Sequence, residues 1–303
     1  MKVVVAATSD VAIPTLNWLF RSENQLIRIV STPDSRSGRG QLLKESPISK
    51  WADENSLPLE KPNTVEEMEK AFTGADLVLV IAYGKIIPEK LLSIPTHGFL
   101  NLHFSLLPAY RGAAPVQRAI KNGENVTGVS IFRIERDIDT GPIFVQQKYV
   151  IPQNANSGYV LQELAKIGPS IFQETFAALS KGVLPKPQPT EGVSYAPKVT
   201  KEDAYINWFE PSEKILNAIR AFTPNPGAWT MFRGATLKIS DAQAYSGDLK
   251  LLPGNLHVGS KTFLVGTNDS PIEIAALVPP GKREMSASEW INGARISPGE
   301  IFE

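Results

Sequence analysis

Three polar side chains, in two distant stretches of the sequence, have the types and spacing needed for acyl transfer to an amine. Asn101 and His103 alternate with apolar residues in a predicted strand, so both point to one face of it. Asp139 lies in an Asp-Thr-Gly-Pro turn, which cannot continue a strand and presents its carboxylate outside the backbone. The amide and the imidazole could stabilise an oxyanion, while the carboxylate orients the imidazole and helps to remove the proton of the amine. Such chemistry requires neither a thiol nor a metal.

Each of these side chains also has a plainer interpretation. An Asn-x-His pair can be a hydrogen-bonded strand end, and an aspartate in a turn usually caps its own backbone. Asp137 precedes Asp139 by two residues and competes with it for any catalytic role. The spacing alone leaves these alternatives open.

The elements before Pro108 indicate how the polar pair is positioned. Short apolar runs alternate with helix-like segments, which predicts a Rossmann-like, open and mostly parallel α/β sheet with helices on both faces. Ligands bind such sheets at the carboxyl ends of the strands, where Asn101 and His103 are expected. The expected strands cover residues 2–7, 27–31, 77–82, 99–103, 129–135 and 143–151. The expected helices cover residues 13–20, 115–122 and 161–179.

A proline-rich stretch separates this part from the rest of the chain. Four prolines between residues 181 and 198 predict a semi-extended linker. We therefore expect a catalytic domain at 1–185, a linker at 186–206 and a C-terminal domain at 207–303. The last begins with an expected helix at 212–222. Short apolar runs between turns follow it, which favours a small β-barrel of the oligonucleotide-binding type.

The composition excludes several classes of protein. The chain contains no cysteine, which removes disulfides and thiolate chemistry, and it contains no G-x-G-x-x-G after a strand, which removes the usual dinucleotide-binding dehydrogenases. Its 31 basic and 31 acidic residues balance, so a nucleic acid would have to meet a local basic patch. Its apolar runs are far shorter than the roughly 20 residues that span a bilayer. We expect a cytoplasmic monomer that has no membrane or DNA partner.

The stretches around the three polar residues, NLHFSLLPAYRGAAPVQRAI and GVSIFRIERDIDTGPIF, resemble the signature of the folate-dependent formyltransferase family. The resemblance implies that Asn101, His103 and Asp139 are the catalytic residues and that the formyl donor is 10-formyltetrahydrofolate, with no metal. The implied folate-binding loop consists of Ser105, Leu106, Leu107 and Pro108. The implied pteridine pocket is lined, largely through backbone groups, by Ile81, Tyr83, Gly84, Ile86 and Ile87.

The acceptor is implied by the remainder of the chain, because family members with different acceptors share the catalytic core. The segments SGRGQLLKESP, YAPKVTKEDAYINW, RAFTPNPGAWT and PPGKREMSASEWINGARISPGE are similar to members that formylate initiator methionyl-tRNA for translation initiation. Phosphate contacts are then expected from a basic loop at residues 33–47 and from the linker. The candidates are Arg36, Arg39, Lys44 and Lys198.

Two other functions stay open at this point. One is a formyltransferase that acts on an amino-sugar nucleotide, and the other is a catalytically silent RNA- or folate-binding protein on the same scaffold. The first turn also departs from the family pattern, because Ala7, Ser9 and Val11 stand where relatives typically have Gly, Pro and Phe. A missing glycine restricts the backbone, so substrate contacts are expected to differ there.

Overall fold

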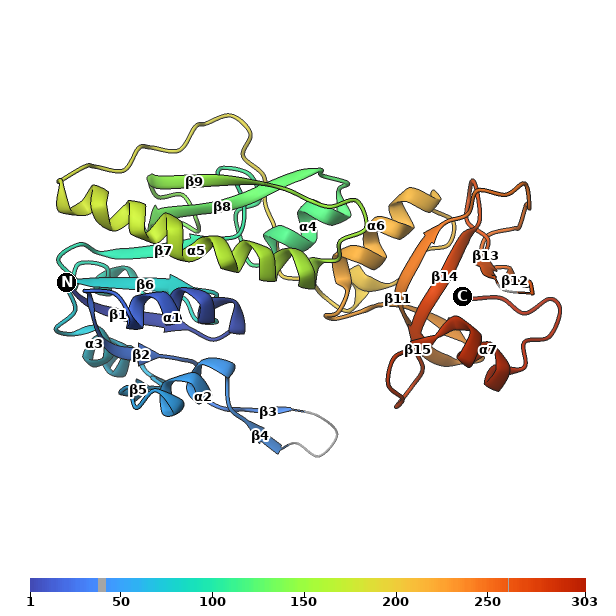
Figure 1. Ribbon diagram of the computed structural model, residues 1–303, viewed down its shortest axis with the longest axis horizontal. Helices are drawn as coiled ribbons and strands as arrows, with labels where there is room; N and C mark the ends of the chain where they lie inside the picture. The colour runs from blue at the N-terminus through green and yellow to red at the C-terminus, as the bar shows by residue number, and fades with distance from the viewer. Residues whose placement is uncertain (38–41, 261) are drawn as a thin grey trace. The chain divides into compact units, whose positions relative to one another are not determined.

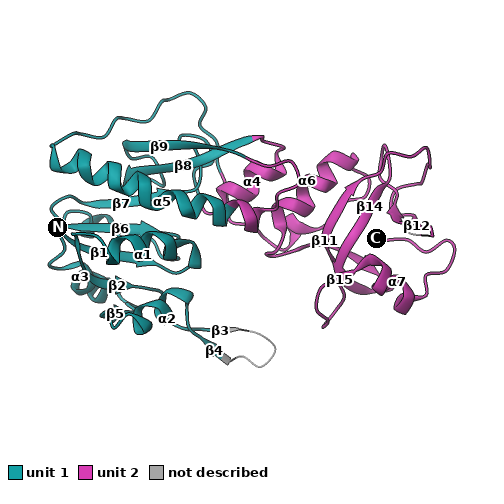
Figure 2. Ribbon diagram, in the orientation of Figure 1, with its two compact units in different colours: residues 1–112, 126–150, 161–195 teal, residues 113–125, 151–160, 196–303 magenta. Residues whose placement is uncertain are grey.

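The computed structural model describes residues 1–37, 42–260 and 262–303, which form two compact units (Figure 1). Unit 1 comprises residues 1–112, 126–150 and 161–195, and unit 2 comprises residues 113–125, 151–160 and 196–303 (Figure 2). Two short segments that interrupt unit 1 in the sequence thus pack with the C-terminal residues. The sequence suggests contiguous domains with boundaries at residues 185 and 206, and these boundaries stay a prediction. The two units of the structure, in contrast, interleave along the chain.

Unit 1 is built on a seven-stranded sheet of order β5-β2-β1-β6-β7-β8-β9 (Figure 1). The strands are β1 (Lys2–Ala7), β2 (Gln25–Val30), β5 (Leu59–Glu60), β6 (Leu77–Ile81), β7 (Phe99–His103), β8 (Val126–Arg133) and β9 (Ile143–Val150). The strands from β5 to β7 pair in parallel, and β8 and β9 add antiparallel pairs at one side. The predicted mostly parallel sheet is confirmed, although the sequence did not indicate β5.

Helices cover both faces of this sheet. They are α1 (Ile13–Phe20), α2 (Pro47–Glu54), α3 (Val65–Phe72) and α5 (Ser157–Ser180), with 3-10 turns η1 (Asp10–Ala12) and η2 (Glu89–Leu91). A capping box between Thr64 and Glu67 begins α3. On the opposite face, Gly168 of α5 leaves so little room that a Cβ there would lie 3.2 Å from a methyl group of Leu102. The helices α2 and α3 were not predicted from the sequence.

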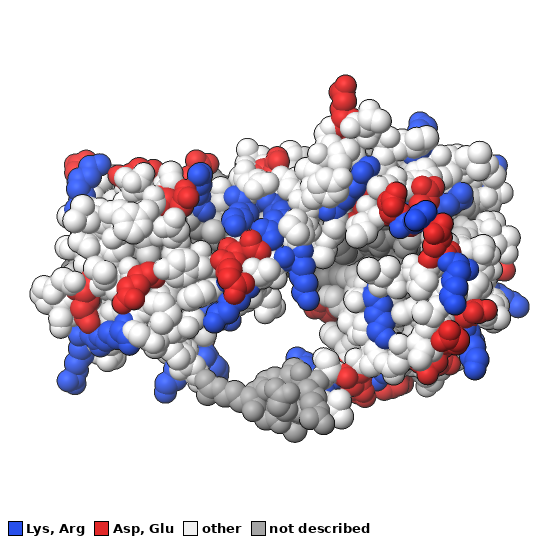
Figure 3. All heavy atoms as spheres, turned by 180° about the vertical axis from the view of Figure 1, so that it is seen from behind, with Lys and Arg blue, Asp and Glu red and all other residues white. Residues whose placement is uncertain are grey.

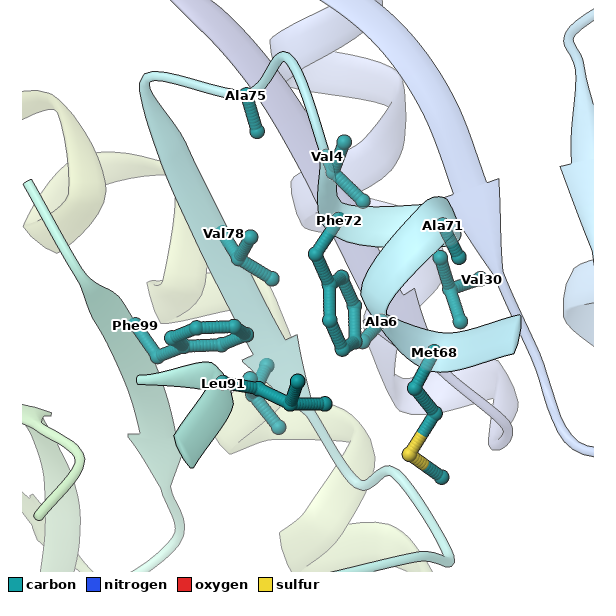
Figure 4. Close-up of a cluster of buried hydrophobic side chains, with 11 residues drawn as sticks. Val4, Ala6, Val30, Met68, Ala71, Phe72, Ala75, Val78, Leu91 and Phe99 are labelled. Carbon is teal, nitrogen blue, oxygen red and sulfur yellow. The ribbon is translucent and has the colours of Figure 1, made fainter. Parts of the chain in front are cut away.

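The face of the sheet under α3 holds a cluster of buried apolar side chains (Figure 4). Phe72 of α3 and Phe99 of β7 meet edge to face, with their ring centroids 5.0 Å apart. Because side chains alternate along a strand, Asn101 and His103 lie on the same face as Phe99. The cluster therefore ends where the polar pair begins, and it fixes the strand that carries the pair.

The predicted basic loop contains a short hairpin. Strand β3 (Ser35–Ser37) pairs in antiparallel fashion with β4 (Leu42–Lys44), so both ends of the loop are tied together. The sequence indicated an irregular loop here, because three-residue strands give no measurable alternation. Residues 38–41, between the two strands, lie outside the described residues.

Unit 2 has a curled antiparallel sheet of order β10-β11-β14-β13-β12, with β15 paired to β14. Its elements are α4 (Pro115–Lys121), η3 (Glu202–Ala204), α6 (Ser212–Phe222), β10 (Ala228–Phe232), β11 (Ala235–Ala244), β12 (Leu256–Val258), β13 (Phe263–Val265), β14 (Ile272–Val278), β15 (Met285–Ser286) and α7 (Ala287–Ala294). Phe232, Phe263, Trp290 and Phe302 pack ring against ring in its core. Among the described helices, none combines the length and apolar character that crossing a bilayer needs.

Candidate active site

The carboxyl end of β7 presents Asn101 and His103 between β6 and β8. His103 is buried, with 5% of its surface exposed, and Asn101 is half-buried. Among residues 1–37, 42–260 and 262–303, no group hydrogen-bonds the side-chain amide of Asn101. The strand thus places an amide with free donors beside a desolvated imidazole, at the sheet edge where the sequence placed a ligand.

The two nitrogens of His103 have different surroundings. Nε2 lies 2.9 Å from the carbonyl oxygen of Tyr110, and Nδ1 lies 3.7 Å from Oδ2 of Asp139. A carbonyl oxygen only accepts, so Nε2 carries a hydrogen and donates it. In the neutral ring, Nδ1 therefore presents its lone pair toward Asp139.

Opposing effects act on the pKa of His103. Burial lowers the pKa of His103, and this effect is opposed by the charge of Asp139 and by the hydrogen bond to the carbonyl group of Tyr110. Phe132 closes one side of the ring, in an edge-to-face contact with centroids 6.3 Å apart. The imidazole is consequently held neutral at rest, while the adjacent carboxylate favours the charged form once a proton arrives.

Asp139, and not Asp137, meets His103. Asp137 is exposed, and its carbonyl oxygen accepts a hydrogen bond from the hydroxyl of Thr140 at 3.1 Å. Asp139 adopts a left-handed backbone conformation with φ of 53°, and its Oδ2 accepts a hydrogen bond from the backbone N–H of Gly112 at 2.7 Å. The side chain of Asp139 is 15% exposed. Of the two carboxylates that compete in the sequence, that of Asp139 is the one that lies beside His103.

The predicted folate-binding loop, residues 105–108, is fixed by two polar side chains of the neighbouring strands. The hydroxyl of Ser130 donates to the carbonyl oxygen of Ser105 at 2.6 Å and accepts from the N–H of Leu107 at 3.1 Å. The amide of Gln146 donates to the carbonyl oxygen of Leu107 at 2.9 Å. Neither Ser130 nor Gln146 stands out in the sequence, because several polar residues occur along both strands.

The remaining residues of this loop are packed as tightly. Leu106 lies over β8, where a Cβ on Gly128 would come within 2.6 Å of its methyl carbon. The hydroxyl of Ser105 donates to the carbonyl oxygen of Ala109 at 2.6 Å, and Pro108 is buried. The loop is thus preorganised, which reduces the entropy that a ligand must overcome on binding.

The predicted pteridine-pocket segment follows β6 and divides into inner and outer residues. Ile81 is fully buried, and Tyr83 and Ile87 pack against the apolar cluster of Figure 4. Gly84 and Ile86 are exposed, with 82% of the Ile86 surface accessible. Burial raises the pKa of Tyr83 to about 12, and its buried hydroxyl has no hydrogen-bond partner among the described residues. The inner side chains therefore support the segment, and its backbone and Ile86 are left to meet a ligand.

The predicted tRNA-binding residues lie in both units. Lys44 is exposed at the end of β4 in unit 1, and Lys198 is exposed in unit 2. The backbone of Arg36 pairs with Leu43 in the hairpin, and Arg39 lies outside the described residues. Basic and acidic side chains are interspersed on the face shown in Figure 3. A positive electrostatic potential that attracts phosphate on this face must therefore come from a few neighbouring cations.

The first part of the predicted linker is an integral part of unit 1. Lys186 and Ile143 exchange two backbone hydrogen bonds of 2.7 and 2.8 Å. Ser194 accepts two further bonds of 2.9 Å, one by its carbonyl oxygen from the N–H of Arg111 and one by its hydroxyl from the N–H of Tyr110. We name residues 186–195 the strap. Its prolines signalled an extended backbone, but the sequence could not show what that backbone pairs with.

A cavity of about 580 Å³ borders the strap and the turn of Asp139. Its lining includes Arg111, Thr140, Gln188 and Tyr195. A larger cavity, of about 670 Å³, lies in unit 2 and is lined by residues of α4, η3 and α6 and the segments beside them; none of the predicted catalytic residues is among them. Within the described part of the chain, no group of three or more acidic or histidine side chains could hold a metal ion.

Comparisons with known proteins match both parts of the chain to one family. Residues 1–176 match the family model "Formyl transferase", and residues 198–295 match "Formyl transferase, C-terminal domain". The chain is 41% identical to the methionyl-tRNA formyltransferase of Thermobifida fusca over 309 residues, covering 100% of this chain and 99% of that protein. It is 40% identical to that of Acidothermus cellulolyticus, covering both chains completely.

Solved structures share the fold at lower sequence identity. Methionyl-tRNA formyltransferase from Clostridium thermocellum matches 82% of this chain and 95% of its own with a TM-score of 0.58 at 21% identity. HypX from Aquifex aeolicus in complex with tetrahydrofolic acid matches 98% of this chain and 48% of its own with a TM-score of 0.70 at 16% identity. From the two family models and the identity along the whole chain, it follows that the protein belongs to the formyl transferase family, among its methionyl-tRNA formyltransferases.

Proposed function

We propose that this protein transfers the formyl group of 10-formyltetrahydrofolate to the amino group of methionine on initiator tRNA. The observation that carries the proposal is the arrangement of His103 and Asp139 beside the free amide of Asn101. Full-length relatives named methionyl-tRNA formyltransferase support this choice of acceptor.

The three side chains divide the chemistry between them. The folate donor supplies an electrophilic formyl carbon, whose oxygen gains charge when an amine attacks. The amide of Asn101 is free to donate a hydrogen bond to that oxygen. Nδ1 of His103 takes the proton of the amine, because Nε2 already carries one, and then delivers it to the departing folate nitrogen. Asp139 stabilises the imidazolium that exists between these two events.

The residues around the trio fit a folate. The preorganised loop at residues 105–108 lies directly after β7, and the exposed side chain of Ile86 offers apolar surface after the neighbouring strand β6. Tyr83 and Ile87 face the core, so the pteridine would meet mainly backbone groups of this segment. Parallel strands that pair directly bring both segments to one edge of the sheet.

For the tRNA, we propose phosphate contacts from the exposed cations of the hairpin and of the segment after the strap. Lys44 and Lys198 are both exposed. The formal net charge is zero, so these contacts must act locally, within about a Debye length of 8–10 Å at physiological salt. Arg36 and Arg39 belong to the same proposal.

An acceptor panel tests the proposed function. Purified protein is given 10-formyltetrahydrofolate with initiator methionyl-tRNA, elongator methionyl-tRNA or an amino-sugar nucleotide, and formylated product is measured in each case. We expect the highest kcat/KM with initiator methionyl-tRNA. Faster turnover of the sugar nucleotide would assign the other acceptor, and folate binding without turnover of any acceptor would indicate a silent scaffold.

A further inference from the structure

We propose that Gln188, on the strap, is a positioning residue: it fixes the backbone of the turn that bears Asp139 and so keeps the carboxylate beside His103. This inference rests on the proposed function, because it assigns a task in the same reaction. Gln188 lies 49 residues after Asp139 in the sequence, and its side chain joins the turn of Asp139 to the loop that follows β7.

Four hydrogen bonds fix the amide of Gln188. Its Nε2 donates to the carbonyl oxygens of Asp139 and Gly141, each at 2.8 Å. Its Oε1 accepts from Nη2 of Arg111 at 2.6 Å and from Nε of Arg111 at 3.2 Å. The carbonyl groups only accept and the guanidinium only donates, so the amide has a single orientation that satisfies all four contacts.

These contacts close a ring around the catalytic carboxylate. Asp139 binds Gly112 through its side chain, Gly112 follows Arg111 in the chain, Arg111 binds Gln188, and Gln188 binds the carbonyl oxygen of Asp139. The backbone of Asp139 is left-handed, a conformation that costs free energy in a residue with a side chain, although aspartate tolerates it better than most. Gln188 holds the backbone of this residue, while Gly112 holds its carboxylate.

The strap is suited to this task. Gln188 stands between Pro187 and Pro189. A following proline restricts the preceding residue to an extended conformation. The two prolines are exposed and Gln188 is half-buried, so its side chain turns inward from a backbone that is already extended. Little entropy is then lost when the four hydrogen bonds form.

Two substitutions separate positioning from mere stabilisation. In Gln188→Glu the side chain keeps its size and gains an ion pair with Arg111, but it sets a carboxylate oxygen against two carbonyl oxygens that cannot donate. In Gln188→Ala both sides of the ring are lost. If Gln188 acts by holding the turn, both variants lose activity, although only the alanine variant loses its contact with Arg111.

The measurement is kcat and KM for folate and methionyl-tRNA over a range of pH, with Tm as a check of folding. We expect kcat to fall at least tenfold in both variants, with each KM within about twofold of wild type. The acidic limb of the kcat profile should move to lower pH, because a displaced Asp139 no longer raises the pKa of His103. Gln153→Glu, which adds the same charge at an exposed position, is the matched control and should behave as wild type.

Some results would overturn the inference. If Gln188→Glu keeps kcat within twofold of wild type, Gln188 serves only to bind Arg111. A fall in kcat with an unmoved pH profile would also exclude positioning of Asp139. If Gln188→Ala proves unstable, Gln188→Glu alone decides. Wild-type turnover tests the proposed function separately, and if another acceptor is the substrate, the same ratio of variant to wild type is measured with that acceptor.

Discussion

Replacing Asp139 with Asn isolates the charge of the carboxylate that we propose to be catalytic. Asn has nearly the same shape, and its oxygen can still accept the 2.7 Å hydrogen bond from Gly112, so the turn should persist. What is lost is a negative charge 3.7 Å from Nδ1 of His103. At an effective dielectric constant of about 20, two unit charges at this separation attract by about 4 kcal/mol. Solvent screening and relaxation of the site make the loss of stabilisation smaller than this attraction, so we expect kcat to fall by roughly two to three powers of ten.

The assay is single-turnover formylation of methionyl-tRNA at several pH values, together with the Kd for folate. We expect the Kd to stay near that of wild type. The acidic limb should shift to lower pH, since burial then lowers the pKa of His103 without the opposing charge of Asp139. Asp137→Asn removes the same charge from an exposed position and is the control. A rate within threefold of wild type in Asp139→Asn, or an equal loss in Asp137→Asn, would refute the assignment.

Three further substitutions test the turn, unit 2 and the hairpin. Gly141→Ala should lower the free energy of unfolding by about 1–3 kcal/mol and kcat by at least tenfold, because the new Cβ would lie 1.8 Å from the carbonyl oxygen of Arg133. Arg118→Ala should lower the free energy of unfolding by about 1–3 kcal/mol, since it breaks a bidentate pair of 2.7 and 2.9 Å with Asp203. The hydrogen bonds from Arg118 hold the pKa of Asp203 far below its usual value, so this difference should persist above about pH 4 and shrink as the pH falls below it. Lys44→Ala should reduce the salt dependence of tRNA affinity by about one unit of slope, with folate affinity unchanged.

Chemical denaturation, steady-state kinetics and salt-dependent binding check these three expectations. Wild-type kcat in Gly141→Ala would show that the turn tolerates displacement. A stability difference in Arg118→Ala that grows at acidic pH would contradict the role of Asp203. For the hairpin, Lys50→Ala is the control, because Lys50 is also exposed. Equal salt slopes for Lys44→Ala and wild type would remove Lys44 from the interface.

Much of the fold follows from local patterns in the sequence. The buried runs of β1 and β6 are apolar and flanked by breaks, and apolar residues alternate with polar ones along most of β7, so the positions of these strands could be predicted. Alternation along β7 also placed Asn101 and His103 on one face. Strand β5 has two residues and the hairpin strands have three each, which is too short for any periodic signal.

The candidate site was harder to predict because its parts meet only in the folded chain. The sequence left Asp137 and Asp139 as competitors, and the left-handed backbone of Asp139 together with its contact to Gly112 separates them. Nothing in the sequence marks Gln188 as part of the site, because a glutamine between two prolines is also typical of a solvated linker. Its importance depends on Arg111 and on the turn of Asp139, and sequence distance hides both partners.

The interleaving of the two units in the sequence affects how the protein can be truncated, recombined and folded during synthesis. A fragment ending at residue 185 would lack the strap, including Gln188, and it would contain residues 113–125 and 151–160 without the partners they pack with. A functional exchange of C-terminal modules between relatives must therefore carry these two internal segments along, or else preserve their apolar surfaces. During synthesis on the ribosome, residues 113–125 and 151–160 emerge well before residues 196–303, with which they pack. Unit 2 can therefore complete its packing only after the last hundred or so residues have emerged.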